Sequence, residues 1–320
     1  MAQESPRADI VKHYRLDTCF REGSVGHTIS SPSTHKEEWR RAQVIGRGGF
    51  SVVHLEHGPK NRVRAVKVID KTTFSPALDL TRELAIMGFL TEHRVSLFVQ
   101  FLGWFENSEK LYIAMEYFEK DDLRRHLSER MSVPTAKLLA GQLLEGLDIM
   151  HRNGIAHRDI KPELGAEHIR SFPLPFHVKL GDFGVSKRIS AHTMLRTRIS
   201  SRSYSAPEIL GALDSSLATS EYTHAVDIWS LGCVIFEILT GKVLFPVEFC
   251  VWHFCNGKAG SMLEPLKEEM REEGGFEFVG GMLSTEPMGR PSAVEALCDP
   301  WLKVPEIRRV EEGGDMLAVR

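Results

Sequence analysis

The chain has 320 residues, of which 42% are hydrophobic and 26% charged, so it is long enough to bury a full core and to form two packed lobes. Its formal net charge of -3 excludes the broad basic field of a general nucleic-acid or anionic-membrane binder, and five cysteines without a CxxC spacing argue against a disulfide framework. We therefore expect a monomer in the cytoplasm or nucleus, with neither a nucleic-acid nor a membrane partner.

Residues 1–38 are polar and rich in Ser, Thr and His, and they show little periodic apolar signal. This composition predicts a mobile extension without a fold of its own. The first residues also lack the apolar core of a secretory signal peptide.

From Trp39 to Phe118, five apolar runs separated by glycine-rich or polar turns predict an antiparallel sheet. The runs are 42–46, 51–57, 62–69, 97–105 and 110–118. One helical segment, DLTRELAIMGFL (79–90), interrupts them.

After residue 118 the apolar spacing becomes helical, as in AKLLAGQLLEGLDIMHRNG (136–154), which ends in a glycine. We expect a mainly helical second lobe over 119–304 and a charged tail over 305–320. Residues 250–275 give the weakest secondary-structure signal.

Two features of the first lobe carry chemistry. The turn IGRGGFSVV (45–53) would let backbone N–H groups approach phosphate oxygens, although such a turn alone is more often only a hairpin, and Ser51 stands where a third glycine is expected. Lys67 lies among apolar strand residues, and Glu83 on the predicted helix is its candidate partner. Alone, each feature would be weak.

Five further motifs follow in order: HRDIK (157–161), GDFG (181–184), SAPE (205–208), DIWSLG (227–232) and GRPS (289–292). With this series the chain resembles the serine/threonine branch of the eukaryotic protein kinase family, notably calcium/calmodulin-kinase-like and checkpoint-kinase-like catalytic domains, over about residues 40–304. The resemblance implies an α+β bilobal fold, with a sheet lobe over 39–118 and a helical lobe over 119–304. It also implies transfer of the γ-phosphoryl group of ATP to Ser or Thr hydroxyls of proteins, with Mg²⁺.

The resemblance assigns the ATP site to the glycine-rich turn, the lysine and its partner, and the segment joining the lobes. The residues are Ile45, Gly46, Arg47, Gly48, Gly49, Phe50, Ser51, Val53, Ala65, Lys67, Glu83, Met115, Glu116, Phe118 and Asp122. Val53 and Ala65 would cover the adenine, Met115 would be the gatekeeper, and Asp122 would contact the ribose. In a chain without the other motifs, the apolar members would be read as core residues.

The resemblance also assigns the chemistry. Asp159 would accept the proton of the substrate hydroxyl, Lys161 would neutralise charge on the transferring phosphoryl group, and Asp182 would hold magnesium. Lysine two residues after the aspartate is typical of the serine/threonine branch and argues against tyrosine specificity. Glu208 and Arg290 match a structural ion pair of the family, and Asp227 and Trp229 match core positions.

Regulation and substrate choice are implied more weakly. Residues 182–208 carry several Ser and Thr residues among Lys and Arg, so phosphorylation there would pair with Arg158. An unmodified loop is an equal alternative. Glu163 and Asp122 match positions that favour basic substrate motifs.

One position departs from the family pattern. Leu164 occupies the place of an asparagine whose side-chain oxygen binds magnesium, and loss of one such contact costs about 10²- to 10³-fold in rate. Glu163 or Glu167 would be a substitute ligand. Three interpretations stay open: an active kinase with a damaged second metal site, a nucleotide-binding pseudokinase scaffold, and a locally misread sequence. The retained Lys67 and the other four charged residues of the machinery favour the first.

Overall fold

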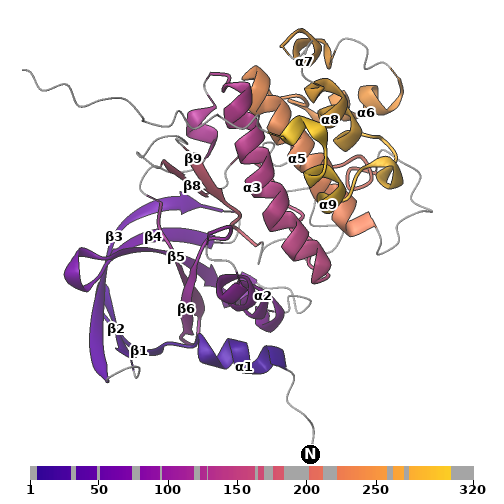
Figure 1. Ribbon diagram of the computed structural model, residues 1–320. Coiled ribbons are helices and arrows are strands. Elements are labelled where there is room, and N and C mark those ends of the chain that lie inside the picture. Colours follow the sequence, from indigo (N-terminus) through magenta and orange to yellow (C-terminus); the bar gives the residue numbers. More distant parts are fainter. Residues whose placement is uncertain are drawn as a thin grey trace, which may run out of the picture.

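The computed structural model describes residues 6–29, 34–48, 51–73, 80–93, 96–118, 123–127, 129–162, 165–168, 176–183, 202–211, 222–257, 262–269 and 274–303. A curved antiparallel sheet with two helices forms one lobe, and a bundle of helices forms the other (Figure 1). This is the bilobal α+β fold that the sequence predicts. The expected division of the lobes after residue 118 stays a prediction.

The sheet has seven strands in the order β1-β2-β3-β4-β5-β7-β6. Its strands are β1 (Asp17–Arg21), β2 (Ser24–Ile29), β3 (His35–Arg47), β4 (Ser51–His57), β5 (Val63–Asp70), β6 (Phe101–Glu106) and β7 (Lys110–Met115). The helix α2 (Leu80–His93) packs against β6. The last five strands and α2 are those predicted from the apolar runs, whose β-branched and aromatic residues favour strands.

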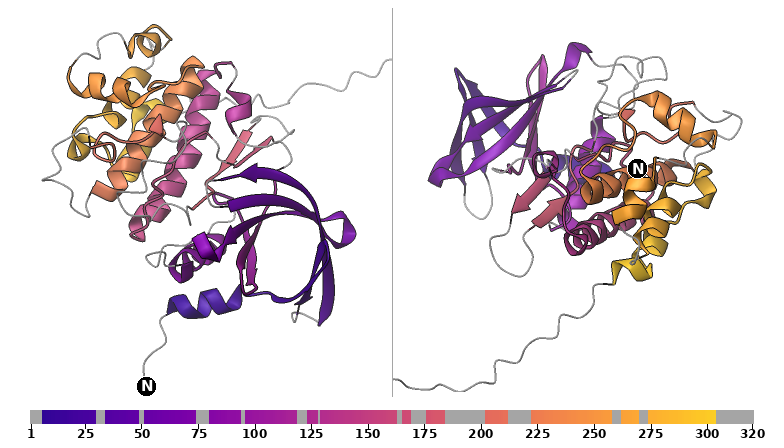
Figure 2. Two further views of the ribbon diagram at one scale, coloured as in Figure 1. Left: turned by 180° about the vertical axis from the view of Figure 1, so that it is seen from behind. Right: turned by 90° about the horizontal axis from the view of Figure 1, so that it is seen from above.

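The expectation of an unfolded extension is wrong for residues 6–29 and 34–38. Here α1 (Pro6–His13) lies beside α2, and β1 and β2 add a hairpin to the sheet (Figure 2). The few apolar residues of this segment, such as Val11 and Val25, are buried against the lobe rather than against one another. Periodicity within the segment therefore gives almost no signal.

A buried polar cluster fastens the hairpin to the sheet. Arg64 donates to Glu56 Oε2 from Nε (3.0 Å) and from Nη2 (2.7 Å), and Nη2 also lies 2.9 Å from His27 Nε2. Since a guanidinium only donates, His27 accepts at Nε2 and donates from Nδ1 to Thr18 Oγ1 (2.8 Å). Burial, and then the charge of Arg64, lowers the pKa of His27 to about 4, so this ring is neutral at neutral pH.

The second lobe is built on two long helices, α3 (Val133–Arg152) and α5 (Tyr222–Thr240). Shorter helices pack around them: α6 (Glu248–Cys255), α7 (Glu264–Glu269), α8 (Gly275–Met282) and α9 (Ala293–Leu297). Between the lobes, β8 (Gly165–His168) pairs with β9 (Phe176–Lys179), which lies against α3. GAEH lacks an apolar pattern, and β8 forms by backbone pairing with β9, which itself packs on α3.

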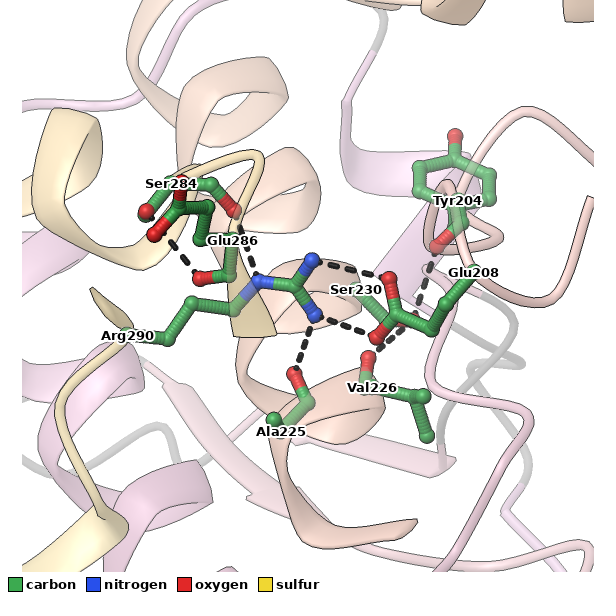
Figure 3. Close-up of polar contacts among 8 residues, drawn as sticks. All are labelled: Tyr204, Glu208, Ala225, Val226, Ser230, Ser284, Glu286 and Arg290. Atoms are coloured by element: carbon green, nitrogen blue, oxygen red, sulfur yellow. Dashed lines mark hydrogen bonds and ion pairs between the residues drawn. The ribbon is translucent and has the colours of Figure 1, made fainter. Parts of the chain in front are cut away.

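The expected ion pair of the helical lobe is confirmed (Figure 3). Arg290 donates to both carboxylate oxygens of Glu208, at 2.6 and 2.9 Å. Its remaining donors reach the carbonyl oxygens of Ala225 (3.0 Å) and Ser284 (2.8 Å). The pair thus ties the SAPE motif to α5 and to the GRPS turn. Among the described residues, no helix is long and apolar enough to cross a membrane.

Candidate active site

The predicted nucleotide residues of the sheet lie on one face of it. Gly46 is opposite Val53 across β3 and β4, and Val53 is opposite Lys67 across β4 and β5. Ala65 is two residues from Lys67 on β5 and is opposite Met115 on β7. Residues directly opposite one another, or two apart on a strand, share a face. The structure therefore gathers these five residues into one surface.

The glycine-rich turn joins β3 and β4 as a strand-to-strand hairpin at this face. Ile45, Gly46 and Arg47 end β3, Ser51 begins β4, and the Gly48 N–H donates to the Ser51 carbonyl at 2.7 Å. A Cβ atom at Gly48 would lie 2.9 Å from Ser51 Oγ, a contact that rotation of the serine side chain would relieve. Gly49 and Phe50 lie outside the described residues.

Lys67 and Asp182 bring the two lobes together at this surface. Lys67 Nζ donates to Asp182 Oδ1 at 2.7 Å. The lysine side chain is 11% exposed and the aspartate side chain 48% exposed. The Lys67 ammonium holds the pKa of Asp182 well below its usual range, so the carboxylate is ionised at neutral pH. Glu83 is buried on α2, and its expected pairing with Lys67 stays a prediction.

The exposed carboxylate of Asp182 fits the magnesium that the fold family implies, since a hard cation prefers carboxylate oxygen. Within the described ranges, no group of three or more His, Cys, Asp or Glu side chains could hold a metal ion. Magnesium commonly binds through one or two carboxylates and completes its shell with phosphate oxygens and water. The residues present therefore suit an ion that arrives with a nucleotide.

Asp227 fixes the backbone of the catalytic loop. Its side chain is fully buried at the start of α5, where Oδ2 accepts from the His157 N–H (2.8 Å) and Oδ1 from the Arg158 N–H (2.7 Å). His151 Nε2 lies 2.9 Å from Oδ2. The sequence placed Asp227 only in the core of the lobe. Its two bonds to the HRD segment give it a direct part in positioning Asp159, the expected catalytic aspartate.

His157 links the catalytic loop to the strand that carries Asp182. Its Nε2 lies 2.8 Å from the Gly181 carbonyl, which only accepts, so Nε2 donates and Nδ1 is the acceptor. Nδ1 in turn accepts from the Asp159 N–H at 3.3 Å. One neutral ring therefore sets the spacing between the two acidic residues of the site.

Asp159 and Lys161 lie together on the loop. Lys161 Nζ donates to Asp159 Oδ2 at 2.8 Å, and the two side chains are 19% and 8% exposed. Arg158 and Asp182 both have left-handed backbone conformations, with φ of 64° and 53°. Non-glycine residues hold such conformations only where their surroundings impose them, here through Asp227 and Lys67.

The segment between the lobes carries a lysine that the sequence reading missed. Lys179 Nζ, at the end of β9, donates to both carboxylate oxygens of Glu116 at 2.8 Å and lies 5.6 Å from the centroid of the Phe118 ring. The Glu116 N–H donates to the Gln100 carbonyl at 2.9 Å. Lys179 therefore holds two of the expected adenine-binding residues. A lone lysine in the apolar run HVKL was the available signal.

Several expected site residues lie outside the described residues. These are Asp122, Glu163, Leu164 and residues 184–201 of the segment expected to carry phosphorylation sites. The backbone of Glu167 lies in β8, opposite His177. Its role as a substitute metal ligand stays a prediction.

Comparison with known proteins bears on this geometry. The sequence model described as the protein kinase domain matches residues 39–302. Serine/threonine-protein kinase RAD53 of Saccharomyces cerevisiae is 30% identical over 273 residues, which is 82% of this chain and 32% of the relative. Serine/threonine-protein kinase cds1 of Schizosaccharomyces pombe is 33% identical over 311 residues, 91% of this chain and 62% of the relative.

A third relative has a similar length. A probable myosin light chain kinase of Dictyostelium discoideum is 31% identical over 287 residues, 86% of this chain and 84% of that protein. The chain spans less than two thirds of the length of the two yeast relatives.

Proposed function

Because this chain belongs to the protein kinase family, we propose that it is an active serine/threonine protein kinase that transfers the γ-phosphoryl group of ATP to protein hydroxyls. The observation that carries the proposal is the contact of Lys67 with Asp182, a half-exposed, ionised carboxylate that faces an ammonium group on the nucleotide face of the sheet. A site that had lost its catalytic activity would have no chemical need for this arrangement.

Each residue of the site has a definite task under this proposal. The bound magnesium ion would supply charge neutralisation at the phosphates, and Asp182 would hold it. Lys67 orients phosphate oxygens, and the glycine-rich turn covers them. Asp159 takes the proton of the attacking hydroxyl, while Lys161, 2.8 Å from it, limits the build-up of negative charge.

A nucleotide-binding scaffold without transferase activity is the second candidate, and Leu164 is the observation that favours it. The asparagine it replaces would bind magnesium and fix the catalytic aspartate. Here Asp159 has two other supports, the His157 ring and Lys161. We therefore expect reduced rather than abolished transfer.

The deciding experiment measures magnesium-dependent transfer of phosphate from ATP by the full chain, to itself and to a generic basic protein. Asp159→Asn is the matched control, because it removes the base and keeps the shape of the side chain. We expect transfer that falls at least about 100-fold in the control. If transfer is absent while ATP raises the melting temperature, the chain is a scaffold.

We also propose protein substrates with a basic motif near the acceptor, from the acidic positions Glu163 and Asp122. An arrayed peptide library tests this preference. Equal phosphorylation of peptides with and without arginine would remove it.

A further inference from the structure

The segment 6–29, called here the N-terminal segment, precedes the residues matched by the family model and lies against the helix that carries Glu83. Ile10 and Val11 of α1, and Tyr14 directly after its last residue, have the spacing of one helix face, and α1 lies beside α2 (Figure 1). The contact is close: a Cβ atom at Gly88 of α2 would lie 2.4 Å from Ile10 Cγ2 and 3.0 Å from the Tyr14 ring. The absence of a side chain at Gly88 therefore allows α1 to pack this closely against α2.

The N-terminal segment is also hydrogen-bonded to the sheet beside α2. The Leu16 N–H donates to the Trp104 carbonyl at 2.8 Å, and the Trp104 N–H donates to the Tyr14 carbonyl at 2.9 Å. The Trp104 indole N–H donates to the Val11 carbonyl at 2.8 Å. Three hydrogen bonds to one residue of β6 thus fix the position of α1. Because β6 also packs on α2, the N-terminal segment contacts both α2 and a strand that α2 packs against.

The apolar contacts lead directly to the active site. Val11 is buried in one cluster with Leu84, the residue after Glu83. Met115, the predicted gatekeeper, and Phe183, the residue after Asp182, pack against the same cluster. A shift of α1 would therefore loosen the packing around α2, Met115 and Phe183 together, because packed interiors transmit small displacements.

The arrangement held in this way is one suited to catalysis. Phe183 is packed against this cluster and also against the core of the helical lobe, where its ring centroid lies 6.1 Å from that of Phe98. With Phe183 so placed, Asp182 faces Lys67 at 2.7 Å. Removing support from α2 would free Phe183 to leave this position and take Asp182 with it.

We propose that the N-terminal segment is a built-in positioning element of the kinase site, in which Ile10, Val11 and Tyr14 hold α2 in its catalytic position. The transfer part of this inference rests on the proposed kinase activity. The packing part does not, since it concerns α2 alone. The two parts can therefore fail separately.

The test uses the full chain with Gly88→Ala, which places a methyl group against Ile10. Since Cγ2 branches from the Ile10 Cβ, it cannot swing away without a change of χ1. We expect hydrogen exchange of the α2 amides to become about tenfold faster. Transfer from ATP should fall about 10- to 100-fold.

Two further variants separate positioning from general damage. Ile10→Ala in the Gly88→Ala background removes Cγ2 and should restore most of the protection and the transfer, whereas two independent losses of stability would add. Gly141→Ala on α3, where a new Cβ meets nothing within 4 Å, should leave both readouts unchanged. If Gly88→Ala yields too little folded protein, Val11→Ala tests the packing of α1 on α2 at the cluster with Leu84.

The outcomes are distinct. Unchanged exchange of α2 in Gly88→Ala and Val11→Ala, or no rescue by Ile10→Ala, would overturn the positioning role. If the unaltered chain transfers no phosphate, the proposed activity fails, and the exchange measurements alone decide whether the N-terminal segment holds α2.

Discussion

The two sides of the active site are held by different means. Beneath the catalytic loop, Asp227 is fully buried and has polar contacts with two backbone N–H groups and the ring of His151. Where the two lobes meet, Lys67 donates to Asp182, whose side chain is 48% exposed. The first arrangement is saturated and built into one lobe, whereas the second joins two lobes and leaves carboxylate oxygen open to a ligand. Buried hydrogen bonds are thus concentrated beneath Asp159, whereas Asp182 keeps exposed carboxylate oxygen, as its proposed role in holding magnesium requires.

The largest expected effect is on activity, at Asp182. Asp182→Asn removes the charge that would hold magnesium, so transfer from ATP should fall about 10³-fold, or roughly 4 kcal/mol of transition-state stabilisation. The urea midpoint should fall much less than in Asp227→Asn, because the carboxylate is half exposed and solvent weakens its pairing with Lys67. Transfer assays and urea unfolding on the same preparation check both. A large loss of stability would contradict the separation of roles.

Asp227→Asn should mainly lower the stability of the fold. The amide cannot accept hydrogen bonds at both of its terminal atoms, so a backbone N–H of the loop loses its partner, and the free energy of unfolding should fall by about 3 kcal/mol. Urea unfolding followed by circular dichroism measures this.

Asp148→Asn is the matched control for Asp227. The Asp148 carboxylate is 16% exposed and pairs with Arg152 one helical turn away, whose side chain is 66% exposed. Its effect should stay below about 0.5 kcal/mol. Equal losses in the two variants would show that Asp227 has no special place beneath the loop.

A smaller effect is expected from pH, in the buried cluster of Arg64 and His27. The pKa of His27 is about 4 in the folded chain and 6.5 for a free histidine. The unfolded chain therefore takes up a proton as pH falls below 6.5, while the folded chain does not, so stability is complete above pH 6.5 and declines below it. At pH 5 the loss should be about 2 kcal/mol.

His27→Gln isolates this contribution from that of the carboxylates. The amide can still accept from Arg64 but does not titrate. Between pH 7.5 and pH 5, the free energy of unfolding should fall by about 2 kcal/mol less in the variant than in the unaltered chain, as measured by urea unfolding. Parallel pH profiles for the two proteins would mean that His27 is not neutral in the fold.

Motifs with a fixed chemical task were predictable from the sequence. The five strands after Trp39, α2, α3, and the pair of Glu208 with Arg290 all follow from local periodicity or from a motif. Partners that depend on tertiary contact were not predictable. Lys179 acts on Glu116 across 63 positions of sequence, and His27 on Arg64 across 37. Nothing local distinguishes such residues from a surface lysine or a loop histidine.

The N-terminal segment was misjudged for the same reason. Its strands pair with the rest of the sheet and its helix packs on α2, so its apolar residues are too few to form a pattern of their own. Composition describes how a segment would behave alone, and this one is not alone.

The hydrogen bonds from Tyr14 and Leu16 to Trp104 have one more consequence. The strand β6 is the last in the sheet order, and these bonds cover its outer edge, while β2 covers the opposite edge at β3. A chain shortened to the family boundary at Trp39 would present both edges, next to the aromatic side chains of Trp104 and Phe105. Exposed strand edges recruit strands from other molecules. The residues that position α1 therefore also occupy the edge of β6 at Trp104.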